Sequence, residues 1–377
     1  MRRYRSLIVV IALLALLHLY IGLRLTEPLA LDGARAAGWT LLAGSFVLTP
    51  VGLLAPRLRR WDLSDGLAWM GLLTMGLFSS LLVLTFVRDL ALLGMTVIGS
   101  PSTRFEYLSA LAVPLLALAV TLIGFVNARR TARVVNVDVP IRNLPPSLDG
   151  YTIVQISDVH VGPTIKRKYI DAIVDKVNEL HPDAIAVTGD IVDGPVERLR
   201  EHTAPLGRLR AQDGVFFVTG NHEYYSGAGE WIEEMRRLGM TVLLNEHAVM
   251  RRGEDALMIA GVTDFNAHHF DPSHRSDPFR AKERAPGDVR ARVLLAHQPR
   301  TALAAQDAGY DLQISGHTHG GQFFPWNLFV PLQQPYVAGL NRLGNMWIYT
   351  SRGTGYWGPP KRFGAPSEIT RIRLVRG

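Results

Sequence analysis

Four long apolar segments in the first third of the chain constrain the fold more than any other feature. None of them contains aspartate, glutamate, lysine or arginine, and one histidine, His18, interrupts the first. Each is close to the roughly 20 residues that a helix needs to cross the hydrocarbon of a bilayer. The first alone fits a signal peptide, but four in succession predict an N-terminal four-helix transmembrane bundle within residues 1–130. The segments span residues 6–23, 36–55, 66–87 and 107–126.

Arginines flank these segments unevenly. One cluster of three arginines precedes the first segment, a second lies between the second and third segments, and a third follows the fourth. In that order the clusters are Arg2, Arg3 and Arg5; Arg57, Arg59 and Arg60; and Arg129, Arg130 and Arg133. The other two loops contain arginines mixed with acidic residues. Because arginines favour the cytoplasmic side, we expect a multi-pass protein of the inner or plasma membrane whose remaining chain lies in the cytoplasm.

The distribution of charge argues against one class of main ligand. Residues 1–135 contain 13 arginines and 6 acidic residues, whereas the rest of the chain contains 27 basic and 27 acidic residues. The basic excess therefore belongs to the membrane half, where it suits anionic lipid headgroups, and we expect membrane lipids as partners. A nucleic-acid-binding domain normally carries a basic excess of its own, so we expect no nucleic acid ligand. The absence of cysteine also excludes disulfides and zinc–thiolate sites.

The second half of the chain has the pattern of a layered α/β domain, which we place at residues 131–377. Residues 134–141 alternate like an edge strand, and Pro140 suits an edge. Helical stripes of apolar residues cover 169–180 and 230–238. Further runs of strand type cover 152–156, 184–188, 215–219, 242–244, 257–259, 293–296, 312–314, 347–350 and 369–374.

Polar side chains able to bind a metal follow five of these strands, at the point where each strand ends. They include five of the twelve histidines. Because the carboxyl ends of strands in an open α/β sheet gather at one edge, we expect these side chains to meet there. In chain order they are Asp158 and His160, Asp190, Asn221 and His222, His297, and His317 and His319.

Carboxylates, imidazoles and one amide suit Mn²⁺, Fe, Zn²⁺ or Mg²⁺. There are more donors than one tetrahedral ion needs, so we expect two divalent ions that share a bridging carboxylate. Two such ions, about 3.5–4 Å apart, form a clamp for displacement at phosphorus. Gly189, Gly220 and Gly316 let the backbone turn sharply near the donors and keep Cβ atoms out of the site.

The ordered motifs resemble those of the calcineurin-like metallophosphoesterases. The motifs are Asp158-x-His160, Gly189-Asp190-x-x-Asp193, Gly220-Asn-His-Glu223, His297 and Gly316-His-x-His319. The stretches "ISDVHVG", "GHTHGGQ" and "SRGTG…RFGAPSEI" are most similar to the bacterial YkuE and YaeI type of membrane-associated phosphoesterase. The resemblance covers the chain from about Arg133 onward and implies an αββα sandwich. It does not reach the four apolar segments.

The resemblance also implies a role for each residue. His222 would lie near the scissile phosphate and stabilise the transition state or protonate the leaving oxygen. The nucleophile would be a metal-bound hydroxide. The ligands would be Asp158, His160 and His319 for the first ion, Asn221, His297 and His317 for the second, and Asp190 for both.

Five features have two interpretations each. Asp193 and Glu223 either take part in the site directly or, as we expect, support it from behind or start a helix. Asp264 either lines the pocket or belongs to a turn. The apolar stretch 323–332 is either a buried loop held by prolines or a lip that touches the bilayer or an acyl chain. Arg362, near Arg352 and Lys361, is either a surface charge or a phosphate contact.

These observations predict a membrane-anchored, metal-dependent phosphoesterase that hydrolyses phosphodiester or pyrophosphate bonds. Tethering beside the bilayer favours a lipid-linked substrate. The alternatives are an anchored general or nucleotide phosphodiesterase and a non-catalytic membrane-binding module. The complete set of donors argues against the non-catalytic module, which has no need to keep seven ligands and His222.

Overall fold

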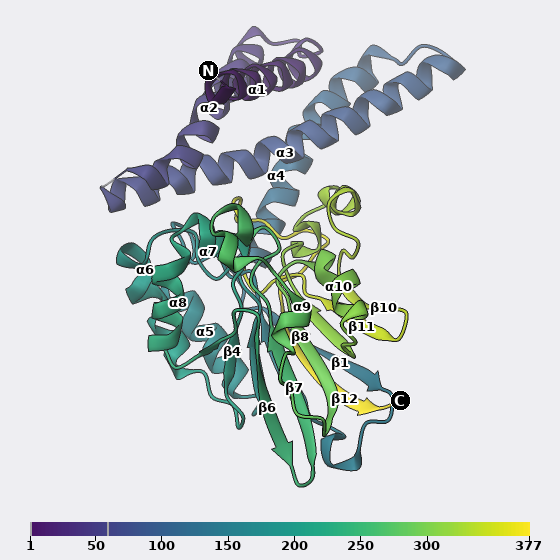
Figure 1. Cartoon of the computed structure of the whole chain (residues 1–377). Helices are drawn as coiled ribbons and strands as arrows, with labels where there is room; N and C mark the ends of the chain where they lie inside the picture. Colours follow the sequence, from purple (N-terminus) through teal and green to yellow (C-terminus); the bar gives the residue numbers. More distant parts are fainter. Residues whose placement is uncertain (1, 59) are drawn as a thin grey trace. The chain divides into compact units, whose positions relative to one another are not determined.

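The computed structural model describes residues 2–58 and 60–377, which form two compact units (Figure 1). Of the flanking arginines, Arg59 lies outside the described residues, as do the side chains of Arg2, Arg3, Arg5 and Arg57. The helical unit comprises Met1–Val126 with Gly358–Lys361. The second unit comprises Asn127–Trp357 with Arg362–Gly377.

The helical unit contains the four predicted helices, each long and apolar enough to cross a membrane. Many of their large apolar side chains are exposed, as expected of surfaces that face lipid. The third helix is 38 residues long and extends beyond the predicted segment at both ends. The helices are α1 (Arg2–Thr26), α2 (Asp32–Leu54), α3 (Trp61–Ile98) and α4 (Thr103–Arg129).

The second unit is built on two six-stranded sheets. In the first sheet, β2 to β5 run parallel and β12 joins them to the edge strand β1. Its strands are, in spatial order, β1 (Arg133–Ile141), β12 (Glu368–Arg376), β2 (Thr152–Ile156), β3 (Ala184–Val187), β4 (Val215–Phe217) and β5 (Thr241–Val242). In the second sheet, β7, β8, β9 and β11 run parallel between antiparallel edge strands. Its order is β10 (Gly339–Leu343), β11 (Met346–Thr350), β9 (Leu312–Ser315), β8 (Val289–Leu295), β7 (Asp255–Gly261) and β6 (Glu246–Arg252).

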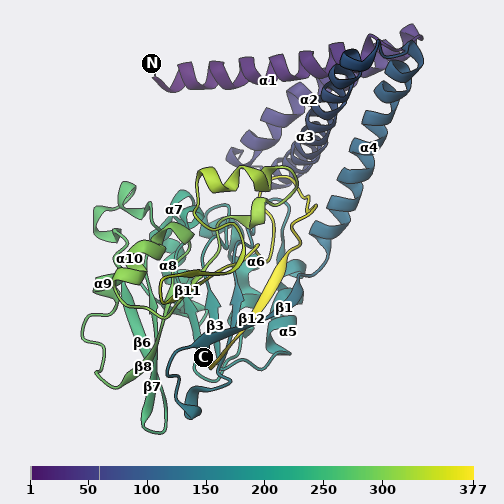
Figure 2. The same cartoon turned by 90° about the vertical axis from the view of Figure 1, so that its right-hand side faces the viewer.

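Five of the six helices in this unit cover the outer faces of the two sheets, whereas the five-residue α7 comes soon after β4. Figure 1 shows α5, α6 and α8 at the left of the strands and α10 at the right. Figure 2 separates the sheets, with β6 to β8 at the left and β1 and β12 at the right. The helices are α5 (Arg167–Asn178), α6 (Val196–Thr203), α7 (Asn221–Tyr225), α8 (Ala228–Arg237), α9 (Pro278–Ala281) and α10 (Ala302–Asp307).

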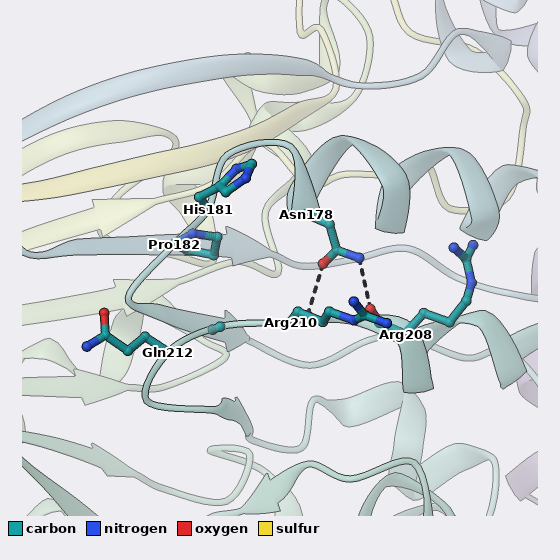
Figure 3. Close-up of a pocket in the computed structure, with 7 residues that line it drawn as sticks. Asn178, His181, Pro182, Arg208, Arg210 and Gln212 are labelled. Atoms are coloured by element: carbon teal, nitrogen blue, oxygen red, sulfur yellow. Dashed lines mark hydrogen bonds between the residues drawn. The ribbon is translucent and has the colours of Figure 1, made fainter.

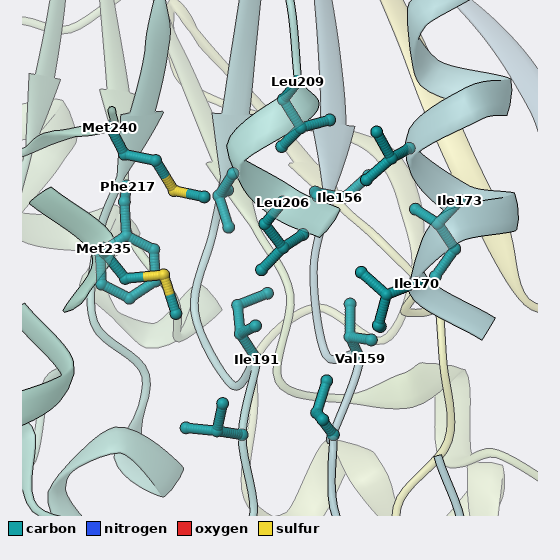
Figure 4. Packing of buried hydrophobic residues seen from close by; sticks show 14 of the residues in the cluster. Ile156, Val159, Ile170, Ile173, Ile191, Leu206, Leu209, Phe217, Met235 and Met240 are labelled. Atoms are coloured by element: carbon teal, nitrogen blue, oxygen red, sulfur yellow. The ribbon is translucent and has the colours of Figure 1, made fainter. Parts of the chain in front are cut away.

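Alternating side chains of each strand fill separate hydrophobic layers. In β2, Ile153 packs between the sheets, whereas Val154 and Ile156 pack against the helices of the first sheet. Figure 4 shows that helix-side layer, in which Ile170 of α5 and Met235 of α8 contribute. A third cluster joins the second sheet to α9 and α10. The predicted αββα sandwich is therefore confirmed.

The predicted strands and helices are present, with small shifts at their ends. Residues 134–141 lie in β1, which pairs only with β12 and is an edge as predicted. The α5 and α8 helices each begin two residues before the predicted stripe. The sequence interpretation missed β6 and β10, whose side chains are mostly partly exposed and whose sequences mix charged and apolar residues.

Candidate metal centre

The predicted donors and His222 all lie just beyond the carboxyl ends of five parallel strands. Asp158 and His160 follow β2, Asp190 follows β3, Asn221 and His222 open α7 after β4, His297 follows β8, and His317 and His319 follow β9. His222 and His317 are partly exposed and the other six are buried. Because β2 to β4 belong to one sheet and β8 and β9 to the other, both sheets contribute to one centre.

One group of three donors consists of Asp158, His160 and His319. Nε2 of His160 lies 3.0 Å from Nε2 of His319, which lies 3.5 Å from Oδ1 of Asp158. The three donor atoms all lie within 4.8 Å of one another. This arrangement can hold one ion.

A second group consists of Asp190, His297 and His317. Nε2 of His297 lies 3.1 Å from Oδ2 of Asp190 and 3.2 Å from Nδ1 of His317. These donor atoms also lie within 4.8 Å of one another. His317 therefore offers Nδ1 and His319 offers Nε2, so the two histidines of the Gly316-His-x-His319 motif belong to different groups.

Hydrogen bonds from the far side of two rings prepare them for metal binding. Nδ1 of His160 donates to Oδ1 of Asp193 at 2.9 Å, and Nδ1 of His297 donates to the carbonyl of Thr188 at 2.8 Å. A proton held on Nδ1 leaves the Nε2 lone pair of a neutral imidazole available to an ion.

The amide oxygen of Asn221 supplies a further test of fit. It is buried, and no hydrogen-bond donor lies within reach of Oδ1 among the described residues. A buried polar atom without a partner is unfavourable unless a ligand satisfies it. Together with the carboxylates and imidazoles, this oxygen fits divalent ions of hard or borderline character.

His222 shares Asp193 with His160. Nδ1 of His222 donates to the same Oδ1 of Asp193, at 2.6 Å. Nε2 of His222 lies 4.0 Å from Oδ2 of Asp190. Burial opposes protonation, but the carboxylates of Asp190 and Asp193 outweigh it and raise the pKa of His222 to about 9. The ring therefore holds a proton at neutral pH and can act as a proton donor.

Asp193 and Glu223 both support the site from behind. Asp193 precedes α6, which begins at Val196, so it does not start that helix. The Glu223 carboxylate accepts three backbone N–H groups, from Asp190 at 2.9 Å, Ile191 at 2.7 Å and Gly220 at 2.6 Å. Glu223 thus binds the turn that carries Asp190 to the turn that carries Asn221.

The backbone is strained at the donors. Five of the ten non-glycine residues with positive φ in the described chain are predicted metal ligands: Asp158, His160, Asp190, His317 and His319. Such conformations are unfavourable for residues with a Cβ and persist where the surrounding structure enforces them, most often at functional sites.

All three predicted glycines are required by close approach, and a Cβ on Gly189 would lie 2.5 Å from the backbone nitrogen of Gly220. A Cβ on Gly316 would lie 2.1 Å from Oγ of Ser157 and 2.2 Å from Oδ2 of Asp158. A Cβ on Gly220 would lie 2.2 Å from Oδ1 of Asp190. No real Cβ is found this close to another atom, so the sequence interpretation of these glycines is confirmed.

Both interpretations of Arg362 are wrong. Its side chain is buried, and it donates to the backbone carbonyls of Gly355, His319, Arg352 and Ala365. Its Nη2 also donates to Nδ1 of His319 at 3.0 Å. Because a guanidinium can only donate hydrogen bonds, Nδ1 of His319 is the acceptor. The ring proton of neutral His319 is therefore on Nε2, where it points at His160. An ion bound through that Nε2 must displace the proton.

Asp264 is a turn residue. Its carboxylate accepts the backbone N–H of Asn266 and the side-chain amide of Gln298, both at 2.9 Å. Neither donor group includes it. The turn interpretation of the sequence is therefore the correct one.

Two aromatic residues beside His222 were missed by the sequence interpretation. The rings of Tyr225 and Trp357 lie 5.2 and 5.7 Å from the His222 ring, and both residues are exposed. The signal was available, since Tyr225 ends the "NHEYY" stretch and Trp357 stands in the glycine- and proline-rich "TGYWGPP".

Comparison with known proteins places this chain among metallophosphoesterases. The family model described as calcineurin-like phosphoesterase matches residues 151–321. A Danio rerio transmembrane protein with metallophosphoesterase domain is 36% identical over 397 residues, covering 99% of this chain and 89% of that protein. An uncharacterized metallophosphoesterase of Campylobacter jejuni is 35% identical over 78% of each chain. YkuE of Bacillus subtilis, also uncharacterized, is 32% identical over 61% of this chain and 81% of its own. The similarity to the Danio rerio protein includes the helical unit.

Proposed function

This chain belongs to the calcineurin-like metallophosphoesterase family, and we propose that it is a two-metal hydrolase of phosphodiester or pyrophosphate bonds. The family and its four apolar helices make it a membrane-associated phosphoesterase. We assign the anchor to residues 1–130 and the hydrolase to residues 131–377. The observation that carries the two-metal proposal is that two of the three candidate donor groups, Asp158–His160–His319 and Asp190–His297–His317, share no residue, and that the oxygen of Asn221 has no partner.

The residues would divide the work as follows. Two divalent ions, when bound, would neutralise the negative charge of the phosphoryl oxygens and activate a water molecule. The attacking water would lose one proton to solvent and its oxygen would bond to phosphorus while the bond to the leaving oxygen breaks, and His222 would donate its Nε2 proton to that leaving oxygen. Asp193 keeps the other ring nitrogen of His222 protonated and the ring oriented. The ligands would be Asp158, His160 and His319 for one ion, Asn221, His297 and His317 for the other, and Asp190 between them.

Metal analysis of the purified full chain tests the two-metal assignment. We expect up to two ions of Mn, Fe, Zn or Mg per chain after purification in buffer that contains these metals. Chelation should abolish hydrolysis of a chromogenic aryl phosphodiester, and added Mn²⁺ should restore it. A chain that binds no divalent ion under these conditions would refute the assignment.

We propose a lipid-linked phosphodiester or pyrophosphate as the substrate, because the hydrolase is tethered to the bilayer. The alternative is a soluble nucleotide diester. A screen in detergent with Mn²⁺ across lipid pyrophosphates, glycerophosphodiesters and nucleotides separates the two. A preference for soluble nucleotides would leave the enzyme class intact and remove the lipid proposal.

The positions of the arginines support a cytoplasmic hydrolase. A carboxyl-terminal reporter that fluoresces only in the cytoplasm should be bright in intact cells. A reporter that is active only outside the cytoplasm, fused at the same place, should be silent. The reverse pattern would invert the topology without affecting the metal site.

A further inference from the structure

The exposed large apolar side chains of the hydrolase unit are confined to one kind of segment. All eleven in residues 127–377 lie in segments that follow the carboxyl ends of parallel strands, the same ends that carry the metal donors. They are Tyr225, Phe265, Phe270, Phe279, Leu303, Phe324, Trp326, Leu328, Phe329, Leu332 and Trp357. Scattered exposed apolar residues are ordinary, but a concentration at one edge marks an interaction surface.

The amino ends of β2, β3 and β4 have a different character. The connections that lead into β8 and β9 hold Phe265, Phe270, Phe279 and Leu303, but those that lead into β2, β3 and β4 contain no exposed large apolar residue in the described chain. Instead, a hollow of about 730 Å³ there is lined by polar and basic residues, including His181, Arg208, Arg210 and Gln212 (Figure 3). In β2, β3 and β4 the contrast between the two ends is therefore clear, since no exposed large apolar residue in the described chain leads into these strands, whereas Tyr225 follows β4.

Five of the eleven residues form one continuous stretch, residues 324–332, which we name the apolar lip. Its sequence, "FPWNLFVPL", contains no charge. Phe324 is 56% exposed, Leu328 62% and Leu332 81%. Of the two interpretations of this stretch, the buried loop is therefore wrong.

The apolar lip is fixed to the domain. The N–H of Phe324 donates to the carbonyl of Phe363 at 2.9 Å. Two short 3₁₀ turns, Trp326–Leu328 and Val330–Leu332, order the residues that follow. The lip presents its apolar side chains from a folded base, so their exposure does not come from an unstructured chain.

A short series of contacts connects the lip to the point where the chain leaves the bilayer. The last turn of α4, Asn127–Arg129, belongs to the hydrolase unit, and Ala128 is fully buried in its core. Arg129 donates to the hydroxyl of Tyr356 at 3.0 Å. The next residue, Trp357, pairs through its N–H and its carbonyl with the side chain of Gln322, each at 2.8 Å. Gln322 lies two residues before the lip.

This series places the lip near the membrane surface. The apolar run of α4 ends at Val126, and Arg129 and Arg130 follow, so the bilayer boundary falls in the last turn of that helix. Tryptophan and phenylalanine favour the zone between headgroups and acyl chains.

Trp357, which belongs to this series of contacts, also lies beside His222, the proposed catalytic histidine. Trp357 contacts the His222 ring from one side, and Tyr225, whose ring lies 5.6 Å from that of Phe270, contacts it from another. All three aromatic residues are about half exposed or more. Exposed aromatic side chains thus surround the His222 ring, and one of them, Trp357, is hydrogen-bonded to Gln322 next to the lip.

We propose that the apolar lip inserts into the interfacial zone of the bilayer that holds the helices of this chain, and that it presents the metal centre to phosphoesters of lipid headgroups. The part of this proposal that concerns the substrate rests on the proposed function. The part that concerns membrane docking rests on the lip alone. Because the lip carries no charge, its insertion depends on apolar burial and is insensitive to salt and to anionic lipid.

The absence of cysteine from the chain permits a direct test of docking. A single environment-sensitive fluorophore on Leu328→Cys, in full-length protein in phosphatidylcholine vesicles, should be quenched by a spin label on carbon 5 of the acyl chain. It should resist aqueous iodide, in low and high salt alike. The matched control is Gln212→Cys, an exposed site at the amino ends of the strands, which iodide should quench. This readout requires no activity, so it stands even if the proposed function fails.

Each other outcome of the fluorescence test rejects docking. Quenching of the Leu328→Cys label by iodide would show that the lip lies in water. Protection from both quenchers, with disulfide-linked dimers of unlabelled Leu328→Cys, would show that a second copy of the chain covers it. Quenching by the spin label only in vesicles with anionic lipid would show electrostatic attachment in place of insertion.

A second measurement tests delivery of the substrate. The ratio of hydrolysis of a phosphodiester lipid in vesicles to hydrolysis of a soluble aryl phosphodiester should fall about tenfold or more in Leu328→Ser/Phe329→Ser. The ratio should not change in Gln212→Ser. A double variant with an unchanged ratio would reject delivery by the lip, whereas loss of both activities in the unmodified chain would reject the proposed function.

Discussion

At the carboxyl ends of the parallel strands, several aspartates and histidines have positive φ angles, and their ionisable side chains are mostly buried. At the amino ends the backbone turns largely through glycines such as Gly150, Gly214 and Gly309, and charges such as Arg208 lie in exposed ion pairs. Both ends belong to the same strands and share the same hydrophobic layers. The difference teaches that strain and buried polar groups concentrate where ligands bind, while the rest of the fold follows ordinary local rules.

The largest effect that this comparison predicts is at Asp190, whose carboxylate belongs to the second donor group and is proposed to serve both ions. Asp190→Ala should lower phosphodiester hydrolysis by more than the roughly 100-fold typical of residues that only support metal ligands. Metal analysis should show a loss of bound ions. The exposed Asp307→Asn, on α10, is the control, and a variant at Asp190 with normal activity would refute the site.

His222→Ala should lower hydrolysis by about 10²- to 10⁴-fold, because the leaving oxygen loses its proton donor. Bound metal should remain, since the candidate group that contains His222, together with His160 and Asp193, is not one of those proposed to hold an ion. The comparison variant is the exposed His269→Ala, for which we expect normal rates. Loss of metal in His222→Ala would instead make His222 a ligand.

Asp193→Asn should lower activity or metal affinity by about 10- to 100-fold, as is typical of residues that orient metal ligands. The asparagine keeps the size of the side chain but removes the charge that both His160 and His222 face. Titration with Mn²⁺ measures the affinity, and the pH profile of hydrolysis reports on His222. If neither changes, the shared hydrogen bonds have no part in the reaction.

Gly316→Ala tests the close packing of the catalytic end. The added Cβ would meet Ser157 and Asp158, and we expect a loss of about 1–3 kcal/mol in the free energy of unfolding. Gly287→Ala lies before β8, where nothing surrounds the new Cβ, and should have little effect. Thermal unfolding in detergent measures both variants. Equal effects would mean that the two ends are packed alike.

The smallest effect is expected at Arg208, which forms ion pairs of 2.8 and 2.7 Å with Asp171 and Asp175. The Arg208 side chain is 49% exposed, Asp171 35% and Asp175 60%, and ion pairs in such contact with solvent contribute little to stability. Arg208→Ala should therefore leave both the unfolding temperature and hydrolysis unchanged. A clear loss of activity would show that the hollow at the amino ends takes part in function.

Much of the fold could be read from the sequence because its patterns are local. The four apolar helices follow from their length and composition, and the buried strands follow from runs such as "TIVQI" and "AIAV". The edge strands β6 and β10 were missed because their side chains alternate weakly between core and solvent. Pairing with a neighbouring strand, which no local pattern records, gives them their structure.

The sequence by itself determined which residues stand at the ends of the strands, since motif and strand adjoin in the chain. It also indicated that Gly220 and Gly316 leave room for their neighbours. Only the tertiary structure decided that His317 and His319 belong to different donor groups, and that Arg362 is buried against His319. Only the tertiary structure showed that the side chains of the apolar lip are exposed. These outcomes depend on contacts between segments far apart in the chain, and burial is a property of such contacts and not of a residue type.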